Sequence, residues 1–117
     1  MNGEADIVRE RQAVEALGAL AQTNRLALFR MLVQRGDAGM TAGEIAERLG
    51  VPNSSLSFHL AHLERSGLIS RTRDGRSLIY RADYAAMNRL VGYLMENCCG
   101  GKGCVTELTD TLERIAS

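Results

Sequence analysis

A short β-hairpin signal between helical segments is the feature that most restricts how this chain can fold. Residues 68–73 and 76–81 are β-prone runs, and Asp74-Gly75 lies between them. Aspartate followed by glycine favours the tight two-residue turns that join antiparallel strands. The sequence on both sides instead has the 3.6-residue spacing of apolar side chains. We therefore expect a mostly α-helical fold that contains one β-hairpin.

Four helical segments are expected before the hairpin, and local signals mark their ends. The first covers residues 8–21. The second can be capped by Thr23 or Asn24 and stops at Gly36. The apolar spacing places Val14, Leu17, Leu20 and Ala21 on one face of the first helix and turns Leu26, Phe29, Leu32 and Val33 of the second inward.

The third and fourth helices are separated by a short turn. A capping box opens the third helix, because the Thr41 hydroxyl can accept a backbone N–H and Glu44 can reach back to the cap. Gly50 ends this helix, and the next begins at Asn53 or Ser54. The residues expected to be buried are Ile45, Ala46 and Leu49 in the shorter helix and Leu56, Leu60 and Leu63 in the longer one.

Helical spacing returns after the hairpin, where residues 84–97 and 105–116 each predict a helix. With 117 residues the chain is expected to form a single domain, and dimerisation would help so small a core. The apolar residues that carry this pattern are Met87, Leu90, Val91, Leu94 and Met95 in the first segment and Val105, Leu108, Leu112 and Ile115 in the second.

Helix, short turn, helix and arginine-bearing hairpin, in this order, predict a winged helix-turn-helix that binds DNA. Residues 41–66 would form the helix-turn-helix and residues 68–81 the wing. Small polar side chains on the second helix suit hydrogen bonds to bases or phosphates, and hairpin arginines suit phosphates or the minor groove. The candidate DNA contacts are Asn53, Ser54, Ser55, Ser57 and His59 on the helix and Arg71, Arg73 and Arg76 on the hairpin.

Simpler roles exist for each of these residues. The serines can cap a helix, the arginines can solvate a hairpin, and His59 and His62 can belong to the core. Charge favours the DNA-binding interpretation locally, although the chain as a whole has no net charge. Residues 53–81 hold five arginines against two acids, an excess of three positive charges that is typical of a localised phosphate-binding surface.

The three cysteines of the chain, Cys98, Cys99 and Cys104, lie within seven residues of one another. Structural zinc normally takes four ligands, whereas three thiolates suit a trigonal-pyramidal As(III) or Sb(III). Other soft ions, such as Cd(II), Pb(II), Cu(I) and Hg(II), remain alternatives, as do a thiol redox switch and no role at all. We see no signal peptide and no apolar run near the length of a membrane span, so we expect a reducing cytoplasm.

Three segments carry a resemblance to a known family: residues 17–26, residues 55–63 and residues 66–69. With the Asp-Gly wing that follows, they resemble the arsenic-repressor (ArsR/SmtB) family of metal-responsive bacterial transcription factors over roughly residues 10–97. The resemblance implies a homodimer formed through the first and last helices. It also implies that the protein binds double-stranded operator DNA without the metal and leaves it when the metal binds.

The sequence departs from the two best-known sensing sites of that family. Residues 40–45 lack the Cys-x-Cys of many arsenic repressors, residues 84–97 lack the histidine of the zinc sensors, and Phe58 replaces a residue that is often polar. The cysteine cluster resembles the relocated As(III) sites of some members. We therefore expect residues 84–116 to serve dimerisation and sensing, with As(III) and possibly Sb(III) as inducer and no organic cofactor. Regulation by thiol oxidation is the alternative, and an enzyme is not expected because no Cys-x-x-Cys follows a strand.

Overall fold

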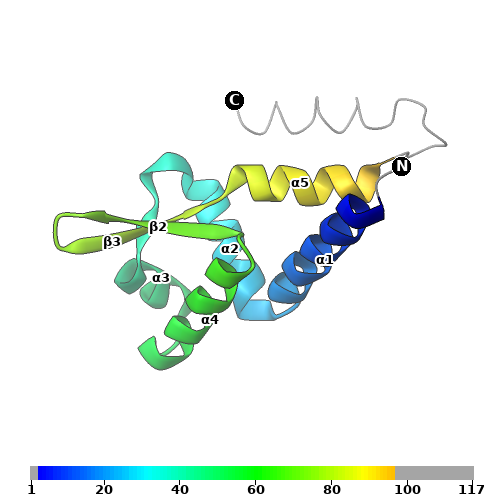
Figure 1. Ribbon diagram of the computed structural model, residues 1–117. Helices are drawn as coiled ribbons and strands as arrows, with labels where there is room; N and C mark the ends of the chain where they lie inside the picture. Colours follow the sequence, from blue (N-terminus) through cyan, green and yellow to red (C-terminus); the bar gives the residue numbers. More distant parts are fainter. Residues whose placement is uncertain (1–2, 97–117) are drawn as a thin grey trace.

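Helices and one small sheet alternate along the chain in the order of a winged helix-turn-helix (Figure 1). The computed structural model describes residues 3–96. The predicted 105–116 helix and the cysteine cluster lie outside this range. The elements are α1 (Gly3–Leu20), α2 (Thr23–Arg35), a 3₁₀ turn η1 (Gly36–Ala38), β1 (Met40–Thr41), α3 (Ala42–Leu49), α4 (Asn53–Arg65), β2 (Ile69–Asp74), β3 (Ser77–Ala82) and α5 (Tyr84–Met95).

The sheet contains the predicted hairpin and one strand that the sequence pattern does not indicate. Its antiparallel order is β1-β3-β2, and β1 adds only two residues through the pair Met40↔Tyr80. The hairpin turn is displaced by one residue from its predicted position. Asp74 pairs with Ser77, so the loop consists of Gly75 and Arg76, and Gly75 supplies the positive φ of 64°. The wing therefore presents an arginine within its turn.

A single apolar core lies between α2, α3, α4 and the sheet. The predicted stripe of α4 is confirmed, because Leu56, Leu60 and Leu63 are all buried. Ile45 of α3 is buried as expected, whereas Ala46 and Leu49 are half-buried. The largest fully buried side chains are Leu28, Leu32, Met40, Ile45, Leu56, Leu63 and Leu68.

The first helix reverses one expectation about which side chains face the protein. Its buried residues are the alanines 13, 16 and 19, whereas Val14 is 62% exposed and Leu17 is 43% exposed. Leu26, expected to point inward from α2, is likewise 45% exposed. Alanines three residues apart form a smooth strip that lets α1 lie close to its neighbours. Ile7, Val8, Val14 and Leu17 consequently point outward, whereas Leu20 is half-buried against the core.

Side chains cap the first turns of α2 and α3. The α2 cap is Gln22, and not Thr23 or Asn24, because the Gln22 side chain accepts a hydrogen bond from the Arg25 N–H at 2.9 Å. The predicted cap of α3 is present, since Thr41 accepts from the Glu44 N–H at 3.2 Å. The Glu44 carboxylate instead accepts a hydrogen bond from Arg35 at 2.7 Å, and this bond is the main reason that its pKa is lowered.

The wing is joined to α5 by backbone and side-chain hydrogen bonds. The Asp83 N–H donates to the Leu68 carbonyl at 2.8 Å, while the Asp83 carboxylate caps α5 by accepting from the Ala86 N–H at 3.0 Å. The Tyr84 hydroxyl donates to the Val33 carbonyl of α2 at 2.9 Å. Among the described residues, no helix is both long and apolar enough to cross a membrane.

Candidate nucleic-acid interface

The turn between α3 and α4 leaves the first side chains of α4 free for other contacts. Gly50 adopts the left-handed conformation (φ 67°) that ends α3, and Pro52 is the N-cap of α4 without a side-chain hydrogen bond. No hydrogen bond to the side chains of Ser54, Ser55 or Ser57 is present within residues 3–96. These serines therefore do not act as the cap of α4, which was the simpler role considered for them.

The exposed face of α4 carries four of the five residues predicted to contact DNA. Asn53, Ser54, Ser55 and Ser57 are exposed. They belong to the first two turns of a helix whose opposite side is anchored by leucines. Because small polar side chains let the helix backbone approach DNA closely, this face suits the major groove.

His59 does not belong to this face, and its predicted exposure is wrong. Its side chain is only 8% exposed, because position 59 follows Leu56 by three residues and so turns toward the core. The Nδ1 atoms of His59 and His62 are both buried, and neither has a hydrogen-bond partner in the part of the chain that the structure describes. Burial lowers the pKa of each histidine, and the Arg25 guanidinium lowers both further. Both rings are thus held in the neutral form and contribute to packing.

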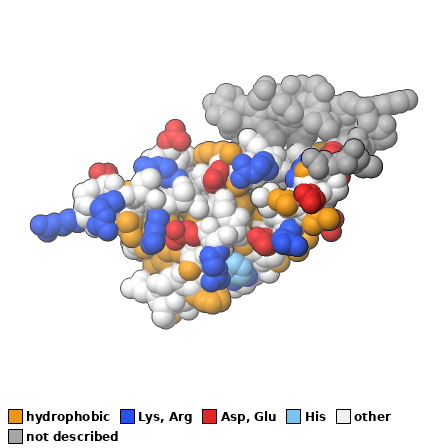
Figure 2. All heavy atoms as spheres, in the orientation of Figure 1, with side chains coloured by type: hydrophobic (Ala, Val, Ile, Leu, Met, Phe, Trp, Pro, Cys, Tyr) orange, Lys and Arg blue, Asp and Glu red, His pale blue; other side chains and the backbone are white. Residues whose placement is uncertain are grey.

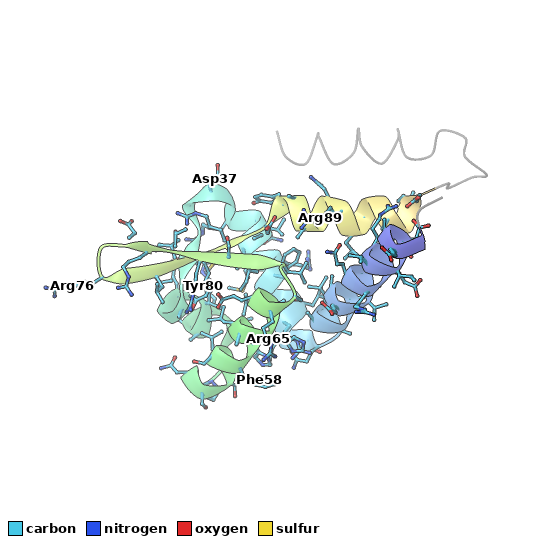
Figure 3. All side chains as sticks on the ribbon, in the orientation of Figure 1. Asp37, Phe58, Arg65, Arg76, Tyr80 and Arg89 are labelled. Atoms are coloured by element: carbon cyan, nitrogen blue, oxygen red, sulfur yellow. The ribbon has the colours of Figure 1, made fainter. Side chains whose placement is uncertain are left out.

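Two of the three candidate arginines of the wing point into solvent. Arg73 and Arg76 are exposed, and among residues 3–96 neither forms an ion pair. Figure 3 shows Arg76 at the tip of the hairpin, directed away from the rest of the protein. The space-filling view in Figure 2 shows further basic side chains along the wing. Long basic side chains at such a tip can reach phosphates on either side of a groove.

Arg71 has a different environment from the other two. Its Nε lies 3.3 Å from the Glu64 carboxylate of α4. A hydrogen bond with the Tyr80 side chain and then the charge of Glu64 raise its pKa. Arg71 therefore connects the wing to the C-terminal end of α4, although its side chain remains 52% exposed.

Arg81, which contributes to the local excess of charge, is used by the fold. Its Nε donates to the Asp37 carbonyl at 2.7 Å, and its NH1 donates to the Thr72 hydroxyl at 2.6 Å. These bonds fasten the two wing strands to the turn after α2. A count of charges in the sequence cannot distinguish such a bound arginine from a free one.

The other end of the molecule joins α1 to α5. Arg9 donates to the Glu96 carboxylate at 2.5 Å and lies over the Tyr93 ring, 5.3 Å from its centroid. Exposed apolar side chains are also present here: Ile7, Val8, Val14 and Leu17 on α1 and Leu94 on α5. Figure 1 shows that the last residues of α5 meet the first residues of α1 at the end of the molecule opposite the wing.

The predicted ligands Cys98, Cys99 and Cys104 lie outside the described residues. Within residues 3–96, no group of three or more histidine, cysteine, aspartate and glutamate side chains could hold a metal ion.

Known proteins are similar to this chain in sequence and in fold. The family described as a helix-turn-helix domain matches residues 20–72. The HTH-type transcriptional regulator YgaV of Escherichia coli K12 is 33% identical over 88 residues, which cover 75% of this chain and 87% of YgaV. The transcriptional activator HlyU of Vibrio cholerae is 31% identical over 88 residues, which cover 75% of this chain and 79% of HlyU.

Three solved structures are similar to this chain. The ArsR-like transcriptional regulator from Rhodococcus sp. RHA1 superposes with a TM-score of 0.67 at 24% identity, over 92% of this chain and 95% of the other. Reduced HlyU from Vibrio cholerae N16961 gives 0.62 at 28% identity, over 82% and 98%. A possible transcriptional regulator for arsenical resistance gives 0.59 at 27% identity, over 68% and 80%.

The fold, the exposed face of α4 and these similarities define a DNA-binding transcriptional regulator of the winged helix-turn-helix class. Within that class, the chain belongs to the ArsR/SmtB family of transcriptional regulators.

Proposed function

We propose that this protein is a homodimeric repressor that leaves its operator when As(III) or Sb(III) binds the thiolates of Cys98, Cys99 and Cys104. The observation that carries the DNA-binding part is the N-terminal half of α4. Its serines are exposed and make no capping bond within residues 3–96, and the Arg71–Glu64 ion pair links the wing to the far end of the same helix. Asn53, Ser54, Ser55 and Ser57 would contact the major groove. Arg73 and Arg76 would contact phosphates or the minor groove.

The surface of α1 and α5 supports the dimer. Several large apolar side chains are exposed on these two helices, although the same α1 buries only alanines within its own domain. Large apolar side chains left exposed close together on a protein surface are typical of sites of association. Two-fold pairing through this end would place two recognition helices about one DNA turn apart, ~34 Å, so the operator would be an imperfect palindrome.

The donor chemistry of the cysteines supports the choice of inducer. Three closely spaced thiols, which become thiolates on binding, match a three-coordinate, sulfur-seeking metalloid. The similarity to a solved structure described as a possible regulator for arsenical resistance points the same way.

The position of the cysteines supplies a route from the inducer to the DNA. They follow α5 in the sequence; the N-cap of this helix, Asp83, is hydrogen-bonded to Leu68 beside the wing, and its first residue, Tyr84, is hydrogen-bonded to Val33 of α2. A coupling free energy of only ~1–3 kcal/mol between metalloid and operator would suffice for release.

Thiol oxidation is the second candidate, and a specific similarity favours it. A similar solved structure is described as the reduced form of HlyU, which directs attention to the redox state of that protein. HlyU is also described as an activator, so whether this protein represses or activates transcription must be measured as well. Sensing of Cd(II), Pb(II) or Cu(I) by the same thiols is a further variant of the proposal.

A mobility-shift assay with operator DNA separates these possibilities. Release of the wild-type protein by arsenite, without release by cadmium or peroxide, is the expected result. Release by peroxide alone would show that thiol oxidation, and not a metalloid, is the signal. Release by cadmium alone would show that the signal is another soft metal.

A further inference from the structure

The recognition helix carries one large apolar side chain that the fold does not use. Phe58 of α4 is 61% exposed. It lies two residues from both Leu56 and Leu60, about 200° around the helix from the buried stripe. It follows Ser54 by four residues and Ser55 by three, so it occupies the same face as these serines one turn further along.

Contacts within the protein cover only part of the ring. The centroid of Phe58 lies 6.0 Å from that of His59 and 6.3 Å from that of His62, both edge-on. Figure 3 shows Phe58 at the outer side of α4. The exposed part of the ring gains free energy only when another apolar group covers it.

The surroundings of Phe58 indicate which apolar group would cover its ring. The exposed residues of α4 within one turn of the ring are small, namely Ser54, Ser55 and Ala61, whereas most of the other large exposed apolar side chains lie on α1 and α5. A single ring among serines offers too little apolar area for a protein partner. In the major groove, the C5 methyl of thymine is the apolar group that the base pairs present.

We propose that Phe58 is a specificity-determining residue that packs against the C5 methyl group of a thymine in each half-site. This inference rests on the proposed role of α4 as the recognition helix. In this arrangement Ser54 and Ser55 hydrogen-bond the DNA one turn earlier along the helix, and Phe58 selects the base at its own position. Because the contact is apolar, it adds to sequence preference without adding a phosphate contact.

Deoxyuridine scanning tests this contact, since uracil differs from thymine only by the missing methyl group. A duplex is first selected from a random library with the wild-type protein, and each thymine is then replaced singly by deoxyuridine. For the wild type we expect about fourfold weaker binding at one thymine per half-site, as for one buried methyl group. Phe58→Ala should bind the thymine and deoxyuridine duplexes equally, and Phe58→Leu should keep part of the difference.

Two further measurements isolate the effect. Phe58→Ala should leave the slope of affinity against salt concentration unchanged, because no phosphate contact is lost. Leu26→Ala, which removes an exposed apolar side chain outside α4, should retain the full difference between thymine and deoxyuridine. The proposal is overturned if no deoxyuridine weakens wild-type binding, or if the same loss persists in Phe58→Ala. A wild-type protein that selects no duplex at all would overturn the DNA-binding role as well.

Discussion

The helices α4 and α1, which lie in different parts of the molecule, orient their large apolar side chains in opposite directions. In α4 the large leucines face the core, and the outward face carries small polar residues and one large apolar side chain, Phe58. In α1 the alanines face the core and the large residues Ile7, Val8 and Val14 face outward. The side chains of α4 that anchor it are buried in its own domain, whereas α1 and α5 carry exposed apolar side chains, which the proposed dimer would cover. A helix that contacts DNA in a fixed orientation is stabilised by large apolar side chains that face its own core, as in α4. A dimer interface instead requires large apolar side chains that face outward, as in α1.

Truncation of the α4 anchor should produce the largest effect. Leu63→Ala removes a fully buried side chain, so we expect the free energy of unfolding to fall by about 2–5 kcal/mol. Phe58→Ala on the exposed face of the same helix is the matched control and should change stability by less than about 0.5 kcal/mol. Chemical denaturation measures both. If both variants lost the same free energy of unfolding, the distinction between a buried and an exposed face of α4 would be wrong.

A charge on the outer face of α1 should affect assembly instead of folding. Val14→Glu would bury an unpaired carboxylate in the proposed dimer interface, at a cost of several kcal/mol, and so favour the monomer. The control Gln12→Glu adds the same charge to the same helix at a polar position. Light scattering at micromolar concentration should find dimers for the wild type and the control, and monomers for Val14→Glu. A monomeric wild type would contradict the assignment of this surface.

The wing and the recognition helix should differ in how they contribute to binding. Arg76→Ala should weaken binding to every DNA sequence and reduce the salt slope by about 0.9, the value for one phosphate contact. Ser55→Ala should weaken operator binding more than binding to random DNA. Fluorescence anisotropy at several salt concentrations gives both quantities. The division is wrong if both variants lose specific and non-specific binding equally.

The buried histidines should give a smaller, pH-dependent effect. Burial lowers the pKa of His59 and His62 below the ordinary value of 6.5, so the unfolded chain takes up protons first as the pH falls. Their contribution to stability is therefore complete above 6.5 and is lost as the pH drops from 6.5 through the lowered values. Denaturation across this range measures it. His59→Gln should flatten the dependence, and an unchanged slope in that variant would remove His59 as its cause.

The parts of the fold that the sequence predicts are those that local physics determines. The stripe Leu56, Leu60 and Leu63 has the helical spacing of large apolar residues, and Gly50 has the backbone freedom that the turn after α3 requires. The strand β1 could not be found in this way. It consists of two residues whose strand character depends on pairing with β3, almost forty positions away in the sequence.

The candidate site shows the same limit. Exposure was inferred correctly for the serines of α4, where side chains are small and polar. It was wrong for His59, because a polar residue type was given more weight than its position three residues after Leu56. The spacing also could not tell which apolar face of α1 meets the domain, since alanine and valine at helical intervals give similar patterns. Arg81 could not be separated from free arginines, because its partners Asp37 and Thr72 are set by tertiary contacts.

The central claim is that three thiols couple a metalloid to operator release, and one titration tests it directly. Arsenite is added to complexes of a fluorescent operator with the wild type and with Cys98→Ser, Cys99→Ser and Cys104→Ser. We predict that all four proteins bind the operator equally, that arsenite releases the wild type, and that each serine variant stays bound. Release of any serine variant at the wild-type arsenite concentration would contradict three-thiol binding. A wild type that ignores arsenite but is released by peroxide would contradict the metalloid itself.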